Sequence, residues 1–374
     1  MSQPVSFYVV VLRKKKNPYN ENQLTILAAI PTPMPKPILI SGIQPTGNLH
    51  LGNYLGALKN FVELQNSGKY ECYFFIADLH ALTENPNPKD LNANIINLAA
   101  DFIAAGLNPK KSVIFQQSQI QPLQELKWVL STLIPPGELL RMTAFKEKVL
   151  QALKPSEREK LTKKEFDELV DNANYGLVEY PVLMAADILI YDGELVPVGK
   201  DQLQHLELAR TLVRKFNKKF GKTFVEPQAL FTKTPRVMSL NDPTKKMSKS
   251  QPEGCLFLND SPKDIEIKIK RAVTDSGSEI KYDPQNKTGV SNLLEIYSAL
   301  SKKSISELEK QYNGKGYGQF KSDLAQLVAE SLKPFRELKA KNPQLKAILN
   351  SGSKKAQKIA AAKMKEVKGK LGLL

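Results

Sequence analysis

The sequence predicts an α/β protein in which a doubly wound parallel sheet is followed by an all-helical region. Over the first two thirds of the chain, short apolar runs of strand length alternate with helix-like segments. Such alternation is typical of parallel sheets that carry helices on both faces. Beyond about residue 259 the apolar positions recur at helical spacing and show no strand alternation, which predicts a separate helical region.

The predicted sheet begins at residues 37–41, where Pro-Ile-Leu-Ile-Ser has the character of a short buried strand. Residues 42–48 carry the Gly, Pro and Asn of a loop. A helix should follow over residues 51–62, because its apolar positions repeat at helical spacing. The next elements continue the alternation and are a strand at 72–77, a helix at 91–105 and a strand at 112–115.

The middle of the chain changes character. Residues 139–174 are charged and lack strand signals, which predicts helical insertions rather than sheet. Strand character returns at residues 195–198, and residues 200–216 have the periodicity of a helix. Helix-length amphipathic segments complete the chain, at residues 265–273, 291–300, 304–312 and 317–341.

Length and composition favour two domains, because 374 residues exceed one ordinary domain and 41% of them are hydrophobic. We expect a poorly ordered N-terminal extension over residues 1–36, since its one acidic residue is Glu21 and it ends in a proline-rich turn. An organelle transit peptide and a true start at Met34 are alternatives for this stretch. The predicted domains are residues 37–258, with a helical insertion at about 139–190, and residues 259–374.

Charge and cysteine content narrow the class of protein. Lys and Arg exceed Asp and Glu by 16, which favours a polyanionic partner, although solubility alone would also explain it. Cys72 and Cys255 lie far apart and outside any C-x-x-C pair, so neither a disulfide framework nor a zinc site is expected. No apolar run approaches the roughly 20 residues of a membrane span. We therefore expect a cytoplasmic protein with no membrane partner, or an organellar one if the extension is a transit peptide.

A candidate nucleotide loop spans residues 46–53, Thr-Gly-Asn-Leu-His-Leu-Gly-Asn, between the first strand and its helix. Doubly wound sheets bind nucleotides at such junctions, where the amides of a helix N-terminus favour phosphate. Gly52 would let a nucleotide approach the backbone closely, while His50 and Asn53 offer hydrogen-bond donors. A helix cap is the simpler interpretation of that His and Asn taken alone, and the P-loop pattern is missing.

A second candidate segment, residues 242–250, holds three lysines within five residues on a loop that contains Pro and Ser. Lysine supplies mobile positive charge to phosphates. A solvated basic loop would be the favoured interpretation of an isolated lysine cluster. The loop at residues 46–53 makes a shared phosphate site the better hypothesis.

Together these two segments resemble the signatures of class I aminoacyl-tRNA synthetases. The His-Ile-Gly-His motif is present as His-Leu-Gly-Asn at residues 50–53, with Asn53 in place of its last histidine. Residues 246–250 match Lys-Met-Ser-Lys-Ser without change. Further segments are similar to the tryptophanyl-tRNA synthetases of bacteria and organelles, at residues 41–47, 52–57, 184–189 and 196–199. The match runs from about residue 37 to the end of the chain. Lys200 departs from it, because bacterial relatives usually carry an acidic residue there.

The resemblance implies a Rossmann-like catalytic domain at residues 37–258 and an anticodon-binding domain at residues 259–374. It implies that the chain activates L-tryptophan with ATP and Mg²⁺ and then esterifies tRNA(Trp). It also implies a homodimer, and DNA is not expected as a partner. The alternatives are a tyrosyl-tRNA synthetase, a small-metabolite adenylyltransferase and a non-catalytic RNA-binding paralogue.

The resemblance also implies roles for single residues, and no residue is assigned to a metal. The catalytic group is Lys246, Lys249, Lys148 and His50. Contacts to ATP are implied for Gln44, Pro45, Thr46, Gly52, Asn53, Gly199, Lys200, Asp201, Val237, Met247, Ser248 and Ser250. Tryptophan would be held by Asp187, Met184, His80, Val196, Val198 and Gln202.

Asp187 carries the amino-acid specificity in this interpretation, since its carboxylate would accept the indole N–H. Apolar neighbours on both sides in the sequence predict that the side chain is buried. Burial raises the pKa of a carboxyl group unless donors hold its charge. A donor such as Gln202 or a backbone amide is therefore expected beside it. His205 is expected to have a structural role.

Overall fold

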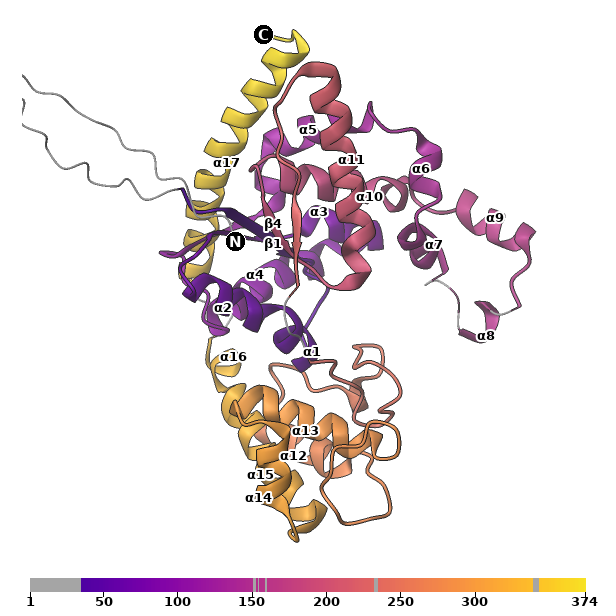
Figure 1. Cartoon of the computed structure of the whole chain (residues 1–374), viewed down its shortest axis with the longest axis vertical. Helices are drawn as coiled ribbons and strands as arrows, with labels where there is room; N and C mark the ends of the chain where they lie inside the picture. Colours follow the sequence, from indigo (N-terminus) through magenta and orange to yellow (C-terminus); the bar gives the residue numbers. More distant parts are fainter. Residues whose placement is uncertain (1–34, 151–152, 154, 159, 232–234, 339–342) are drawn as a thin grey trace, which may run out of the picture. The chain divides into compact units, whose positions relative to one another are not determined.

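The protein is described by a computed structural model, which covers residues 35–150, 153, 155–158, 160–231, 235–338 and 343–374 (Figure 1). The chain divides after Lys36, and residues 37–374 form one compact unit. Nearly all of the predicted N-terminal extension lies outside the described residues. Among the helices that the structure describes, none is long and apolar enough to cross a bilayer.

The centre of the unit is a parallel sheet of five strands in the order β3-β2-β1-β4-β5. The strands are β1 (Ile38–Ile43), β2 (Glu71–Ile76), β3 (Ser112–Gln116), β4 (Leu195–Pro197) and β5 (Gln228–Leu230). The chain adds strands to one side of β1 and then to the other, so the strand order reverses between β1 and β4. Ligands bind at such a switch point, outside the carboxyl ends of the strands.

The predicted doubly wound α/β fold is confirmed, and all four predicted strands form. Strand β5 was not predicted, since it has three residues and contains no β-branched side chain. Nothing in its composition separates it from a loop. β5 belongs to the sheet because it pairs with β4 over three residues in register.

Helices cover both faces of the sheet. Those attached directly to it are α1 (Leu51–Asn53), η1 (Tyr54–Leu58), α2 (Lys59–Asn66), α3 (Asp78–Ala81), η2 (Leu82–Glu84), α4 (Pro88–Ala104), η3 (Gln117–Gln119), α5 (Gln121–Ser131), α10 (Tyr175–Leu189), η4 (Lys200–Gln202) and α11 (Leu203–Phe220). The segment predicted as a helical insertion also holds α6 (Pro136–Leu140), α7 (Thr143–Leu150), α8 (Pro155–Arg158) and α9 (Lys163–Asp171).

After the short turn η5 (Pro252–Gly254), the chain builds a helical region. Its members are α12 (Pro262–Arg271), α13 (Thr288–Ser301), α14 (Ile305–Tyr312), α15 (Gly316–Ser331) and α16 (Lys333–Glu337). The predicted helix at residues 317–341 is thus divided, and Pro334 stands in the first turn of α16, where proline is tolerated.

The last helix, α17 (Pro343–Leu371), returns to the sheet and packs along the edge strand β3. The contact is close: a Cβ added to Gly352 would lie 1.8 Å from the carbonyl oxygen of Ile114. Ser353 Oγ accepts the backbone N–H of Gln116 at 3.3 Å. The sequence analysis grouped this helix with the helical domain, whereas its packing joins it to the sheet (Figure 1).

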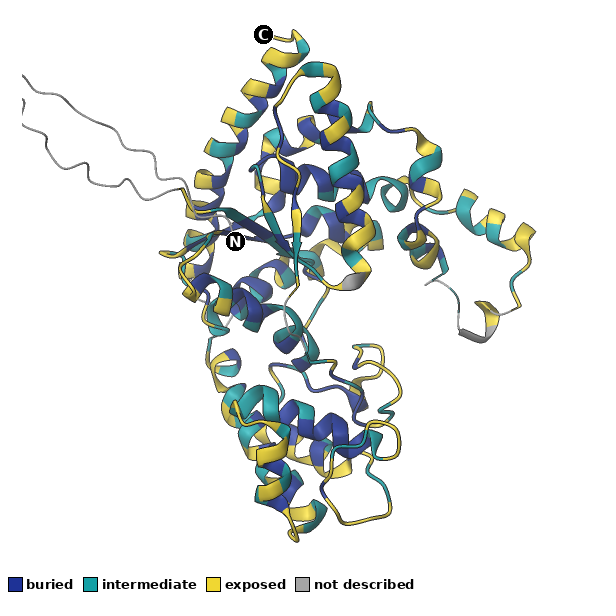
Figure 2. Ribbon diagram, in the orientation of Figure 1, coloured by how far each residue is buried: buried dark blue, intermediate teal, exposed yellow. Residues whose placement is uncertain are grey.

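Two apolar clusters fill the interior (Figure 2). Leu39 and Ile40 are consecutive in β1 yet belong to different clusters, because successive side chains of a strand point to opposite faces. The first cluster joins one face of the sheet to α2, α4 and the helical region. The second joins the other face to α5, α10, α11 and α17. The sheet is therefore buried on both sides.

Candidate active site

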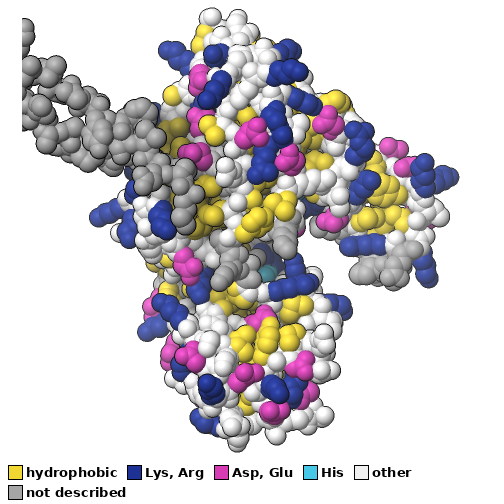
Figure 3. All heavy atoms as spheres, in the orientation of Figure 1, with side chains coloured by type: hydrophobic (Ala, Val, Ile, Leu, Met, Phe, Trp, Pro, Cys, Tyr) yellow, Lys and Arg dark blue, Asp and Glu magenta, His cyan; other side chains and the backbone are white. Residues whose placement is uncertain are grey.

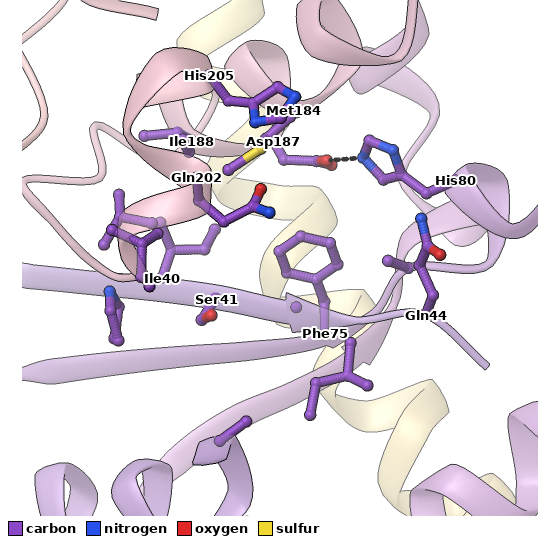
Figure 4. A pocket seen from close by; sticks show the side chains of 18 of the residues that line it. Ile40, Ser41, Gln44, Phe75, His80, Met184, Asp187, Ile188, Gln202 and His205 are labelled. Carbon is purple, nitrogen blue, oxygen red and sulfur yellow. Dashed lines mark hydrogen bonds and ion pairs between the residues drawn. The ribbon is translucent and has the colours of Figure 1, made fainter. Parts of the chain in front are cut away.

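A pocket of about 950 Å³ opens at the carboxyl ends of β1 and β4, at the switch point of the sheet (Figure 4). Predicted site residues that line it are Gln44, His80, Lys148, Met184, Asp187, Val196, Val198, Gly199 and Gln202. Elements far apart in the sequence supply these side chains, including α3, α7, α10, β4 and η4. Every residue predicted to hold tryptophan is among them.

Asp187 lies inside this pocket and is only 3% exposed, as its apolar sequence neighbours predicted. Two side chains donate to its carboxylate. Gln117 Nε2 lies 2.8 Å from both oxygens. His80 Nε2 lies 2.9 Å from Oδ2, the contact that Figure 4 marks with a dashed line. Burial raises the pKa of Asp187, while the hydrogen bonds from His80 and Gln117 oppose that rise. The carboxylate is thus a buried acceptor held in place by the side chains of His80 and Gln117.

The expected donor Gln202 does not fill that role. Its Nε2 atom lies 2.9 Å from Asp201 Oδ2, although the side chain still lines the pocket. Gln117, which follows the carboxyl end of β3 in the chain, was not predicted as a site residue. Its position after a predicted parallel strand was the available signal, since the strand ends of such a sheet meet at one edge.

A tyrosine and a histidine complete the wall beside Asp187. Tyr180 OH lies 2.9 Å from His205 Nε2, and both residues line the pocket. Burial lowers the pKa of His205 to about 4, so its ring is neutral at pH 7. Burial and the bond to Tyr180 agree with the structural role expected for His205, which in addition lines the pocket. Tyr180 was missed, although Met184 and Asp187 stand four and seven positions later on the same helical face.

The predicted nucleotide loop forms a tight cap at the start of α1. His50 Nδ1 accepts the backbone N–H of Asn53 at 3.3 Å, and Asn53 Oδ1 accepts that of His50 at 3.1 Å. Burial, together with the charge of Lys249, lowers the pKa of His50 to about 4. Because Nδ1 is an acceptor, the neutral ring carries its proton on Nε2. A Cβ added to Gly52 would lie 3.0 Å from the His50 ring, so glycine permits this close turn.

The predicted lysine segment reaches the nucleotide loop across the sequence. Lys249 Nζ lies 3.0 Å from the carbonyl oxygen of Thr46, 3.3 Å from its hydroxyl and 3.4 Å from the carbonyl oxygen of Gly47. Burial lowers the pKa of Lys249, and the nearest negative groups oppose that change. The structure thus joins the two segments that the sequence analysis paired. Lys246 is exposed, and Ser248 Oγ lies 2.9 Å from Ser250 Oγ.

A short hairpin carries the lysine segment. The backbone N–H of Met247 donates to Val237 O at 3.1 Å, and Met238 pairs with Lys246 in an antiparallel bridge. Asn292, buried on α13, holds the other side of this hairpin: its amide accepts Met238 N–H at 2.9 Å and donates to Met238 O at 3.1 Å. The lysine segment is therefore fixed to the helical region as well as to the nucleotide loop.

Predicted residues outside the pocket lining are His50, Pro45, Thr46, Gly52, Asn53, Asp201, Val237, Lys246, Met247, Ser248, Lys249 and Ser250. Of Lys200 the structure describes the backbone in η4, and its side chain lies outside the described part. Lys148, at the pocket, forms an ion pair with Glu84 at 3.0 Å. Arg236 lines the rim and was not predicted.

Asp101 is a further acidic group that the sequence analysis missed. It stands on α4, half-buried, and burial raises its pKa to about 7, while the charge of Lys249 acts in the opposite direction. No motif surrounds Asp101, and its burial depends on the helices packed around it. The sequence carried no signal for it.

A doubly wound sheet with a buried acceptor at its switch point and a lysine hairpin beside its first loop defines a class of nucleotide-dependent enzyme. The sequence profile of the family described as tRNA synthetases class I (W and Y) matches residues 34–333. The tryptophan–tRNA ligase of Bacillus anthracis is 46% identical over 343 residues, which cover 90% of this chain and 98% of that protein. That of Bacillus subtilis is 45% identical over 344 residues, with the same coverage. This chain belongs to the tryptophan–tRNA ligases of class I.

Solved structures agree with the sequence relatives. Tryptophanyl-tRNA synthetase from Campylobacter jejuni, complexed with ADP and tryptophan, is 36% identical with a TM-score of 0.74. The match covers 90% of this chain and 99% of that chain. The enzyme from Mycoplasma pneumoniae is 34% identical with the same TM-score, and covers 91% and 99%. The tyrosyl-tRNA synthetase of Aeropyrum pernix is similar in fold alone. It is 21% identical with a TM-score of 0.60, and the match covers 84% of this chain and 89% of that chain.

Proposed function

We propose that this chain activates L-tryptophan with ATP and transfers it to the 3′ end of tRNA(Trp). The observation that carries the proposal is Asp187, a buried acceptor in a largely apolar pocket at the sheet's switch point. The indole nitrogen is a donor only, and it suits this carboxylate. A phenylalanine side chain in the same place would leave Asp187 without that donor, a penalty that reaches roughly 10⁴-fold in discrimination.

ATP would lie beside the loop at residues 44–47, with its phosphates toward the lysine hairpin. Three features support this placement. Gly52 leaves the start of α1 open to close approach, the amides of that helix attract phosphate, and Lys249 already reaches Thr46. Lys246 and Lys148 are further cations for the triphosphate, and Lys148 would exchange its Glu84 partner for it. Mg²⁺ would enter with ATP, because this ion is usually held largely by substrate phosphates and water.

The first step needs no covalent bond to the protein. A tryptophan carboxylate oxygen attacks the α-phosphorus of ATP, the bond to the β-phosphate oxygen breaks, and pyrophosphate leaves. The protein aligns the reactants, which is worth on the order of 7–11 kcal/mol, and its lysines neutralise charge on the leaving group. A ribose hydroxyl of tRNA then attacks the tryptophanyl carbonyl carbon, and AMP leaves with the bonding electrons.

A homodimer is part of the proposal. Trp128 on α5 is 69% exposed and Tyr175 on α10 is 67% exposed. The ion pair between Lys127 and Glu179 joins these two helices. Lys127 precedes Trp128 in the sequence, and Glu179 stands one helical turn after Tyr175. Exposed aromatic side chains that flank a fixed polar pair are typical of an interface between subunits. Sedimentation of the Trp128→Glu variant would test this, since a monomer is expected.

The test of the proposed function is amino-acid-dependent exchange of pyrophosphate into ATP, run with each of the twenty amino acids. Tryptophan alone should support exchange. In Asp187→Asn, kcat/KM for tryptophan should fall by roughly 10²- to 10⁴-fold, because an amide replaces the acceptor that orients indole. In Lys249→Ala, kcat should fall by roughly 10²- to 10³-fold with a small change in KM for tryptophan.

Matched controls are Asp171→Asn, at the end of α9, and Lys263→Ala, exposed on α12. Both should exchange at the wild-type rate. If tyrosine supported exchange and tryptophan did not, the chain would have the specificity of a tyrosyl-tRNA synthetase. Absence of exchange with every amino acid would contradict the proposal and leave a non-catalytic RNA-binding protein.

A further inference from the structure

Helix α17 has one face that is buried against the sheet and one that is exposed to solvent. Over its 29 residues, about 43 Å of helix, one side packs on the sheet cluster through Ala356, Ala360, Met364 and Val367, all of which are buried. The opposite side is exposed along the same length. Because the inward face packs on the sheet, the exposed outward face is available to bind another molecule.

Four exposed lysines occupy this outward side, and we call them the lysine face: Lys354, Lys355, Lys358 and Lys365. At about 100° per residue they lie within about 100° of one another around the helix, and they extend over about 16 Å of its axis. The other exposed residues within this arc are small, Ser351, Ala362 and Gly369, and Ala361 and Glu366 stand at its two borders. No bulky side chain on this face would keep an extended polyanion away from the lysines.

The lysine face has no compensating acid. None of its four ammonium groups forms an ion pair with a carboxylate in the described part of the chain, and Glu366, the one acidic residue of α17, bonds to Lys363 at 2.9 Å. The inward and flanking lysines differ: Lys363 also reaches Asp192 at 2.7 Å, and Lys368 reaches Glu125 at 2.5 Å.

This arrangement does not serve the helix itself. Like charges three or four residues apart, such as Lys354 with Lys358, repel each other and disfavour a helix. Other exposed helices mix their charges, as Lys164 and Glu168 do on α9. A one-signed face that costs stability needs another explanation, and electrostatic attraction to a polyanion provides one.

The lysine face also begins at the functional end of the sheet. Ser353 bonds to Gln116 at the end of β3, and Gln357 Oε1 accepts the backbone N–H of Gln121 at 3.0 Å. Gln117, which bonds Asp187 in the pocket, lies between these two contacts. A polyanion on the first lysines would therefore lie on the side of the sheet where the pocket opens. Figure 3 shows dark blue side chains around the end of the molecule to which α17 leads.

We infer that the lysine face of α17 binds the phosphate backbone of tRNA, an inference that rests on the proposed function. The lysines contact phosphates and carry no base specificity. Each phosphate that a lysine neutralises releases counterions, so binding weakens as salt rises. The lysine face thus contributes affinity for RNA, while the pocket supplies the chemistry.

The experiment compares two variants of the full chain that lose the same charge. The face variant carries Lys354→Gln, Lys355→Gln, Lys358→Gln and Lys365→Gln, since glutamine keeps helix propensity close to that of lysine. The control variant carries Lys69→Gln, Lys89→Gln, Lys110→Gln and Lys218→Gln, four scattered and exposed lysines that form no ion pair within the described chain. Binding of a tRNA(Trp) transcript is measured from 50 to 300 mM KCl, together with tryptophan-dependent exchange.

The face variant should bind tRNA roughly tenfold to hundredfold more weakly, and the slope of log Kd against log salt should fall by about 3. The control should change Kd by less than about threefold with an unaltered slope. Exchange does not need tRNA and should be unchanged in both. Wild-type binding by the face variant, or an equal loss in the control, would overturn the inference. If the wild type showed no tryptophan-dependent exchange, that result would contradict the proposed function only. The comparison of tRNA binding between the two variants does not depend on the exchange reaction.

Discussion

At the scale of single residues, the carboxylate of Asp187 depends on partners that come from distant parts of the chain. Its identity and burial were predictable from Met184 to Ile190, which surround it with apolar side chains. Its donors were not, because Gln117 is 70 residues away in the sequence and approaches only when β3 and α10 pack together. Secondary-structure propensity and the spacing of apolar residues do not predict such a contact, which is seen only in the folded structure.

Substituting Gln117 tests this dependence. Gln117→Leu removes the donor that both Asp187 oxygens share, so the free energy of unfolding should fall by about 1–3 kcal/mol. The pKa of Asp187 should rise further, because a hydrogen bond to the charged form is lost. KM for tryptophan should therefore increase, by roughly tenfold. Urea denaturation and exchange kinetics measure the two effects, and Gln124→Leu, exposed on α5, should alter neither.

Asp101 gives a pH dependence with a defined sign. Its folded-state pKa is about 7, above the ordinary value of 3.8, so between these pH values the folded chain holds a proton that the unfolded chain has lost. Stability contributed by this group is present below about pH 4 and is lost as the pH rises to 7. Asp101→Asn should thus gain on the order of 2–4 kcal/mol relative to wild type between pH 5 and pH 8. Urea denaturation at the two pH values checks this; an equal gain from Asp90→Asn, exposed on the same helix, would contradict it.

At the scale of elements, the sequence was informative where the hydrophobic pattern was long and regular. The first three strands follow from short continuous apolar runs, because both faces of the sheet are buried. The helices of the helical region follow from apolar positions at helical spacing, because one face of each is buried. β5 was missed, since three residues carry too short a pattern. The placement of α17 was missed for another reason: its apolar inward residues suit a sheet edge and a helical bundle equally well. Tertiary contacts decide between them, among them the close approach of Gly352 to Ile114 and the bond from Gln116 to Ser353.

That contact predicts a large effect from one methyl group. In Gly352→Ala the new Cβ would lie 1.8 Å from Ile114 O, so α17 must shift away from β3. We expect a loss of about 1–3 kcal/mol or more, as for other overpacked sites. Gly369→Ala on the same helix has open space around its Cβ and should stabilise by about 0.5–1 kcal/mol. Thermal denaturation of both variants measures the difference, and equal midpoints would refute the packing described for α17.

At the scale of the whole molecule, the predicted boundary at residue 258 does not separate two cores. The first apolar cluster contains Leu39 and Phe74 of the sheet together with Leu293 and Phe320 of the helical region. The second contains the sheet side chains Tyr73 and Phe115 together with α17. Each cluster takes residues from both sides of the boundary. A sequence shows where composition changes, and shared burial across that change becomes visible only in the fold.

Expression of residues 37–258 alone should therefore fail to give a cooperative fold. The fragment lacks α12 to α17 and would expose apolar side chains of both clusters to water. Broad thermal transitions and strong binding of a hydrophobic dye are expected. The chain without residues 1–33 is the control, and it should unfold cooperatively and keep its exchange activity. A sharply unfolding fragment would contradict this account of the core.

The place of α17 at the end of the chain has a consequence during synthesis. β3 is complete once residue 116 has left the ribosome, but the helix that covers its edge ends 255 residues later, at Leu371 (371 − 116). At 5–20 residues per second this interval lasts roughly 13–50 s. Throughout it, the edge strand of the nascent chain presents unpaired backbone groups, which other strands can join. Newly made chains should thus depend on chaperones until their last helix emerges.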